Sequence, residues 1–209
     1  MGEFKERITA EEIEALEYAS FEGKIKVIDS FGKEFDEAIS YLKRQSVIGF
    51  DTETKPCFSP DQPHSKVALL QLSSPKKAYL FRLKILGGLP KKLSDILANP
   101  KILKIGAATH DDVRGLQKYS PFKASGFVDL QKIVGEWGIL DKSVKKMAAI
   151  ILGMRISKTQ QLSNWEAEHL SEPQLLYAAT DAWVCYMMYM KLMSTPKPVL
   201  VEEEIIVEI

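Results

Sequence analysis

Two acidic residues, Asp51 and Glu53, end an apolar run in the stretch VIGFDTETKP at residues 47–56. Alternate residues of a β-strand point to the same face of its sheet, so a strand here would place the two carboxylates side by side. At a separation of roughly 7 Å and an effective dielectric constant near ~20, the two charges repel by roughly 2 kcal/mol. This cost raises the question of which partner the pair has.

A further carboxylate, Asp181, lies in the strongly apolar stretch LLYAATDAWVCYMMY at residues 175–189. Ser171 and Gln174 have the spacing of a capping box, which predicts that a helix begins here. Tyr177 and Asp181 are four residues apart and would share one face of that helix. A helix so rich in apolar residues is buried on several sides, and a buried carboxylate needs a partner.

The stretch KIGAATHDDVRGL at residues 104–116 places two more acids, Asp111 and Asp112, in the first turn of a predicted helix. Acidic side chains stabilise helix N-termini electrostatically, so this pair alone is also explained by a structural role. Taken together, however, the three stretches contain at least four carboxylates at element ends or on an apolar helix.

Four carboxylates in one pocket require counter-charge, and two divalent cations would supply four positive charges. Ligands that are all oxygen atoms favour Mg²⁺ or Mn²⁺ over zinc. Two such ions roughly 3.5–4 Å apart are a known arrangement for in-line attack on a phosphodiester. The sequence therefore predicts a two-metal site.

Three motifs in this order, FDTE, DDVRGL and YAATDA, resemble the DEDD superfamily of 3′–5′ exonucleases, whose fold is ribonuclease-H-like. The sequence is most similar to the ribonuclease D branch and to the exonuclease domain of the Werner syndrome protein, over about residues 46–193. KVALLQLSS, AYLFRL and SNW strengthen the similarity. The resemblance implies an enzyme that uses Mg²⁺ or Mn²⁺ to release 5′-mononucleotides from the 3′ end of DNA or RNA.

The resemblance also implies which residues act. Asp51, Glu53 and Asp181 would hold the metal that activates water, with Asp51 bridging to the second metal. Asp112 fits the family pattern Asp-x-x-x-Leu, because Leu116 follows it by four residues, and would act on the second ion or through its outer shell. Asp111 is then left to the helix-terminus role.

Tyr177, four residues before the final acid, indicates the tyrosine branch of the superfamily and would orient the attacking water by a hydrogen bond. The resemblance places the backbone of Thr52 beside the terminal base and Lys158 near the substrate phosphate. A lone lysine in a polar loop is more often solvated, so that alternative for Lys158 stays open.

The periodicity of apolar residues predicts the elements that must position these side chains. Strands are expected at Lys24 to Asp29, Ser46 to Glu53, Val67 to Ser73, Ala78 to Leu83 and Ile102 to Ala107. Helices are expected from the Thr9 cap to Tyr18, at Lys33 to Lys43, Leu93 to Leu97, Thr109 to about Tyr119, Asp129 to Trp137, Ser143 to Leu152 and Ser171 to about Met193. Strands dominate the first half and helices the second, which favours an α/β three-layer domain with a mixed sheet flanked by helices.

The 209 residues, 45% of them hydrophobic, suit one globular domain with terminal extensions. We expect a lead-in at 1–45 packed on the domain, an exonuclease domain at 46–193 and an acidic, apolar tail at 194–209. No apolar stretch is long enough for a membrane partner, nothing indicates an organic cofactor, and the oligomeric state stays open. The two cysteines suggest neither a disulfide framework nor the spacing of a metal site, so a cytoplasmic setting is expected.

The formal net charge is zero, which argues against long-range attraction of nucleic acid. A nucleic-acid partner would therefore be held by local contacts. The alternative function is a catalytically inactive module that kept this fold for binding nucleic acid or protein, although all five motif residues are present.

Overall fold

A computed structural model of the protein describes residues 3–57 and 65–198. Its centre is a six-stranded sheet with the order β1-β4-β3-β2-β5-β6. The strands are β1 (Lys24–Ile28), β2 (Val47–Thr54), β3 (Val67–Ser73), β4 (Lys77–Arg82), β5 (Leu103–Gly106) and β6 (Phe127–Asp129). Strand β3 runs antiparallel to β2 and β4, whereas the other neighbours are parallel, which confirms the predicted mixed sheet.

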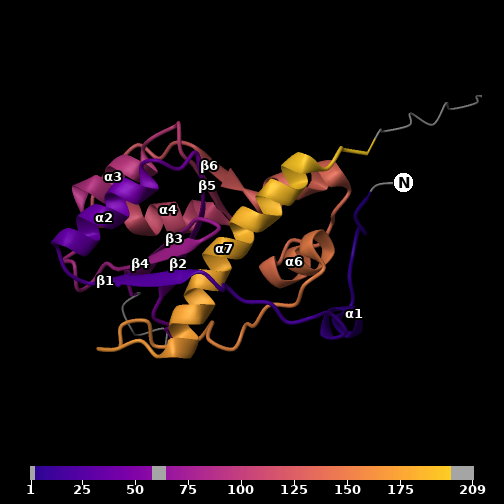
Figure 1. The fold of residues 1–209 in the computed structure, drawn as a ribbon, viewed down its shortest axis with the longest axis horizontal. Coiled ribbons are helices and arrows are strands. Elements are labelled where there is room, and N and C mark those ends of the chain that lie inside the picture. Colours follow the sequence, from indigo (N-terminus) through magenta and orange to yellow (C-terminus); the bar gives the residue numbers. More distant parts are fainter. Residues whose placement is uncertain (1–2, 58–64, 199–209) are drawn as a thin grey trace, which may run out of the picture.

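Helices cover both faces of this sheet (Figure 1). One face packs on α2 (Lys33–Leu42), α3 (Lys91–Leu97) and α4 (Thr109–Gln117). The other face packs on α5 (Leu130–Ile133), the 3-10 turn Val134–Trp137, α6 (Val144–Leu152) and the long α7 (Glu172–Ser194). The short α1 (Ala10–Glu14) packs on α6. The α/β class and the three layers are as predicted.

Alternation along β2 decides which of its residues face which helices. Ile48 and Phe50 are buried in the core beneath α2, α3 and α4. Gly49, which lies between them, faces α7, and a Cβ added there would lie 1.8 Å from the carbonyl oxygen of Ala182. This close approach, which only glycine permits, brings α7 directly onto the strand that carries the first two acids.

Helix α7 begins at the predicted capping box. The Ser171 hydroxyl accepts from the Gln174 backbone N–H, and the Gln174 amide oxygen accepts from the Ser171 backbone N–H. Both interactions satisfy N–H groups that have no partner within the helix. Small residues, among them the fully buried Ala178 and Ala182, let the helix lie close to the sheet.

One predicted helix is shorter in the structure and one strand was not predicted, because the backbone pairs with distant segments at both places. The helix predicted from the Thr9 cap ends at Glu14 rather than Tyr18, because Tyr18 pairs with Arg155 in an isolated β-bridge. The helix predicted at Asp129 to Trp137 is present as α5 and the 3-10 turn, but the strand before it, β6, which pairs with β5, was not predicted. Asp129 is both the last residue of this strand and the N-cap of α5, where its side chain accepts from the Gln131 backbone N–H.

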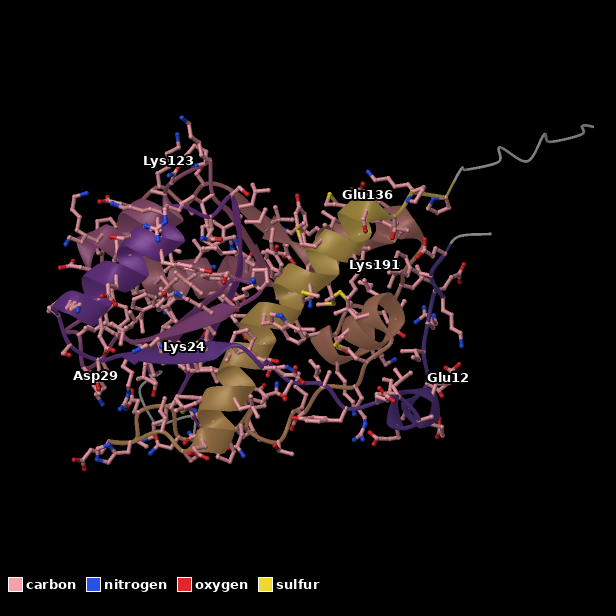
Figure 2. All side chains as sticks on the ribbon, in the orientation of Figure 1. Glu12, Lys24, Asp29, Lys123, Glu136 and Lys191 are labelled. Carbon is pink, nitrogen blue, oxygen red and sulfur yellow. The ribbon has the colours of Figure 1, made fainter. Side chains whose placement is uncertain are left out.

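Charged side chains of both signs surround the molecule, as Figure 2 shows for Glu12 on α1 and Lys123 between α4 and β6. Among the described residues, no helix has the length and apolarity needed to cross a bilayer. Most of the predicted tail and residues 58–64, between β2 and β3 in the chain, lie outside the described residues. The domain boundaries stay predictions.

Candidate active site

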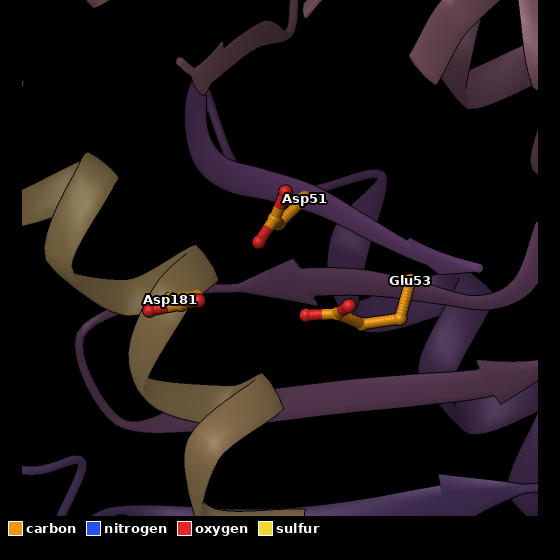
Figure 3. Close-up of side chains that lie close together, drawn as sticks. All are labelled: Asp51, Glu53 and Asp181. Carbon is orange, nitrogen blue, oxygen red and sulfur yellow. The ribbon is translucent and has the colours of Figure 1, made fainter. Parts of the chain in front are cut away.

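Three carboxylates from two elements converge where β2 passes under α7 (Figure 3). Asp51, Glu53 and Asp181 each present an oxygen within 4.8 Å of the others. Glu53 is 9% exposed and Asp181 4% exposed, so both are largely removed from water. We call these three residues the acidic cradle. Strand alternation places the first two acids together, and the packing of α7 adds the third.

Burial and mutual repulsion make the ionised cradle unfavourable without cations. Desolvation raises the pKa of Asp51 well above its ordinary value, and the negative charges of Asp181 and Asp112 raise it further. Desolvation and the neighbouring Asp51 raise the pKa of Glu53 to about 9. Protons therefore occupy part of the cradle at neutral pH when no cation is bound, and a cation must displace them.

Lys158 supplies the cradle with one positive charge. Its Nζ lies 2.8 Å from Oδ2 and 3.1 Å from Oδ1 of Asp181, and 3.4 Å from the Tyr177 hydroxyl. Desolvation alone would lower the pKa of Lys158, but the attraction of Asp181 outweighs it and raises the pKa. The solvated alternative for this lysine is therefore wrong. Nothing in the polar loop sequence marks this contact, which spans 23 residues of chain.

Asp112 approaches the end of β2 from the opposite face of the sheet. Its Oδ1 accepts a hydrogen bond from the Thr52 hydroxyl, because Thr52 points away from the α7 face and toward α4. Burial raises the pKa of Asp112 to about 6, and its charge is felt by Asp51. Asp111, in contrast, is exposed. The hydroxyl of Thr52, which the sequence did not single out, fixes the orientation of Asp112.

Tyr177 lies beside Asp181 on the same face of α7, as the four-residue spacing predicts. The phenol is 6% exposed and its ring lies against Trp165, with centroids 5.9 Å apart. Desolvation, followed by the charges of Asp181 and Glu53, raises the pKa of Tyr177 far above its ordinary value. The hydroxyl therefore remains protonated and can donate a hydrogen bond.

Comparison with known proteins identifies the family of this chain. The sequence profile described as 3′–5′ exonuclease matches residues 30–195. The chain belongs to the 3′–5′ exonuclease family. This result confirms the resemblance to the DEDD superfamily.

Two mouse relatives illustrate the match to this exonuclease family. The bifunctional 3′–5′ exonuclease/ATP-dependent helicase WRN of Mus musculus is 33% identical over 161 residues, which is 72% of this chain and 11% of WRN. The exonuclease 3′–5′ domain-containing protein 2 of the same organism is 34% identical over 178 residues, 78% of this chain and 27% of that protein. The chain thus spans only about a tenth and a quarter of their lengths.

Solved structures place the exonuclease chain in the ribonuclease-H-like fold predicted from the sequence. The Aedes aegypti Nibbler EXO domain superposes with a TM-score of 0.73 at 24% identity, covering 84% of this chain and 91% of that domain. Escherichia coli RNase D superposes with a TM-score of 0.72 at 22% identity, covering 82% of this chain and 44% of that one.

The donor set of the acidic cradle fits a hard divalent cation. All of its potential ligands are carboxylate oxygens, which Mg²⁺ and Mn²⁺ prefer, and zinc sites usually contain nitrogen or sulfur. Three carboxylates beside a single ammonium also leave an excess of negative charge. Both the chemistry and the charge of the acidic cradle fit a bound cation.

Proposed function

We propose that this chain is a metal-dependent 3′–5′ exonuclease that hydrolyses phosphodiester bonds of nucleic acid by a two-metal-ion mechanism and releases 5′-mononucleotides. The observation that carries the proposal is the acidic cradle, in which acids 128 to 130 residues apart in sequence meet beneath α7. Membership of the exonuclease family supports it. When bound, Mg²⁺ or Mn²⁺ would activate water and neutralise charge on the departing oxygen.

The residues divide these tasks. Asp51, Glu53 and Asp181 would hold the cations, with Asp51 shared between them. Asp112, fixed by the Thr52 hydroxyl, would act on the second ion or through its outer shell. Ligands drawn from both faces of the sheet would thus meet at the end of β2.

Three other groups would bind and orient the reactants. The Tyr177 hydroxyl, held protonated by its surroundings, would orient the attacking water by a hydrogen bond. Lys158, a cation with 29% of its side chain exposed, would contact the substrate phosphate from the edge of the cradle. The backbone of Thr52 would lie beside the terminal base.

The finer assignments belong to the same proposal. Tyr177, rather than a histidine five residues before Asp181, supports the tyrosine branch, because Leu176 occupies that earlier position. We propose either Mg²⁺ or Mn²⁺ as the cation and a cytoplasmic setting. A nucleic-acid 3′ end, from DNA or RNA, would be the substrate.

The test is degradation of a 5′-labelled oligonucleotide by the purified chain with Mg²⁺, with Mn²⁺ and with EDTA. We expect a ladder of products shortened from the 3′ end that forms only with a divalent cation. Parallel reactions on single-stranded and recessed DNA and RNA would identify the substrate. Absence of a ladder on all of these substrates with both metals would instead support the inactive binding module.

Adjacent acids on α4 offer a matched pair of variants. Asp112→Asn should abolish most of the activity, because this carboxylate faces the end of β2, whereas Asp111→Asn should retain the wild-type rate. Both changes remove one negative charge from the first turn of the same helix, so they share the helix-terminus effect. Equal rates for the two variants would contradict the assignment of Asp112.

A further inference from the structure

A fully buried glutamine, Gln71, lies on β3 directly across from Asp51. Residues paired in this way project to the same face of the sheet, with Cβ atoms about 4.5–5.5 Å apart. On its other side Gln71 pairs with Leu80 of β4, which is also fully buried. Of its two neighbours in register, Asp51 is the polar one.

The amide group of Gln71 is unsatisfied. Within residues 3–57 and 65–198, both Nε2 and Oε1 of Gln71 are buried without a hydrogen-bond partner. Lys104, a fully buried polar residue on β5, donates by contrast to three backbone carbonyl oxygens. A buried amide without partners is unfavourable and uncommon, and it calls for an explanation.

From this position we infer that Gln71 is a positioning residue: once cations are bound, its Nε2 donates to the carboxylate of Asp51 and fixes the orientation of that carboxylate. The inference rests on the proposed function. A carboxylate that binds a cation still has lone pairs for a donor, and a glutamine side chain is long enough to span the gap between opposite Cβ atoms. Residues that support metal ligands by hydrogen bonds orient those ligands and tune metal affinity.

The second acid of β2 provides the contrast. Glu53 lies directly across from Leu69, which is fully buried and offers no hydrogen bond. The polar support is therefore placed opposite Asp51, the acid proposed to bridge both cations, whose orientation affects both sites. Leu69 has the same position in register relative to Glu53 as Gln71 has relative to Asp51, so Leu69 serves as a matched control.

Calorimetric titration of Mn²⁺ into the metal-free chain tests the inference without an activity measurement. Gln71→Met has a similar shape but cannot donate, and we expect its Mn²⁺ affinity to fall 10- to 100-fold. Its thermal midpoint without metal should stay equal or rise, because the change removes two unpaired buried groups. Leu69→Met should keep the wild-type affinity.

The possible results separate this inference from the proposed function. Wild-type Mn²⁺ affinity in Gln71→Met would overturn the role of Gln71 and leave the proposed function standing. Equal losses in Gln71→Met and Leu69→Met would assign the effect to packing and would also overturn it, as would a Gln71→Met chain that does not fold. A wild-type chain that binds no Mn²⁺ would overturn the proposed function and this inference together.

Discussion

Two lysines, the fully buried Lys104 and the partly buried Lys158, occupy surroundings of opposite kinds. Lys104 on β5 is fully buried, and its Nζ donates to the carbonyl oxygens of Ile96, Asn99 and Ile102 at 3.3, 2.8 and 2.7 Å. Its three N–H donors thus meet three neutral acceptors. Lys158 instead faces the acidic cradle, where three carboxylates and one ammonium leave two negative charges when all groups are ionised.

This difference separates a structural region from a functional one. Around Lys104 the polar groups satisfy one another, and the lysine ties the end of α3 to the sheet. In the cradle, burial gathers charges of one sign and the chain does not balance them. Such an arrangement destabilises the metal-free fold, and it is useful only if external cations complete it.

Asp181→Asn should produce the largest effect: a loss of exonuclease activity without a loss of stability. We expect exonuclease activity to fall at least a thousandfold, about 4 kcal/mol in transition-state stabilisation, because a ligand of the cradle is lost. The free energy of unfolding of the metal-free protein should stay within about 1 kcal/mol of wild type or increase, since a buried charge is removed. Rate measurements and urea unfolding on the same preparation check both expectations.

Lys104→Met should have the opposite result: a loss of stability without a loss of activity per folded molecule. The change leaves three carbonyl oxygens around the former ammonium without a donor, and we expect a loss of about 3 kcal/mol in the free energy of unfolding. Activity per folded molecule at a temperature well below unfolding should match wild type. A stable Lys104→Met chain with impaired catalysis would erase the distinction between the two regions.

The contributions of the two regions to the free energy of unfolding should also change with pH in opposite directions. Glu53 has a pKa of about 9 in the fold against 4.5 unperturbed, so the folded state holds the extra proton and metal-free stability falls between these values. Burial lowers the pKa of Lys104 from 10.5 to about 8, so the unfolded state holds the extra proton there and stability rises from pH 8 to 10.5.

Each proton contributes at most about 1.4 kcal/mol per pH unit to these slopes. Urea unfolding of the metal-free protein at several pH values measures them. Glu53→Gln should flatten the decline above pH 4.5, and Lys104→Met should remove the rise above pH 8. A decline of unchanged steepness in Glu53→Gln would assign it to other groups.

Tyr177→Phe should have the smallest effect on activity, and it tests whether the hydroxyl only orients water. Loss of one donor beside Asp181 should lower kcat about tenfold, or about 1.4 kcal/mol, with little change in KM. Because the hydroxyl stays protonated, we expect the pH profile of kcat to keep its shape. A loss as large as that of Asp181→Asn would give Tyr177 a greater role than water orientation.

Much of the site could be predicted because its parts are local. The shared face of Asp51 and Glu53 follows from strand alternation, and that of Tyr177 and Asp181 from helical spacing. Capping chemistry at Ser171 fixed the start of α7 to within a residue. The two departures are the early end of the first helix near Tyr18 and the strand β6, which was not predicted; in both, the backbone pairs with a distant segment.

The amino-acid sequence is enough to show which acids share a face and where the long helix begins, because backbone geometry repeats with a fixed period. It takes the three-dimensional fold to show that Lys158 pairs with Asp181, that Thr52 donates to Asp112 and that Gln71 lies across from Asp51. These contacts join segments that are 20 to 60 residues apart. They depend on sheet register and on how closely α7 packs against Gly49, which no local period encodes.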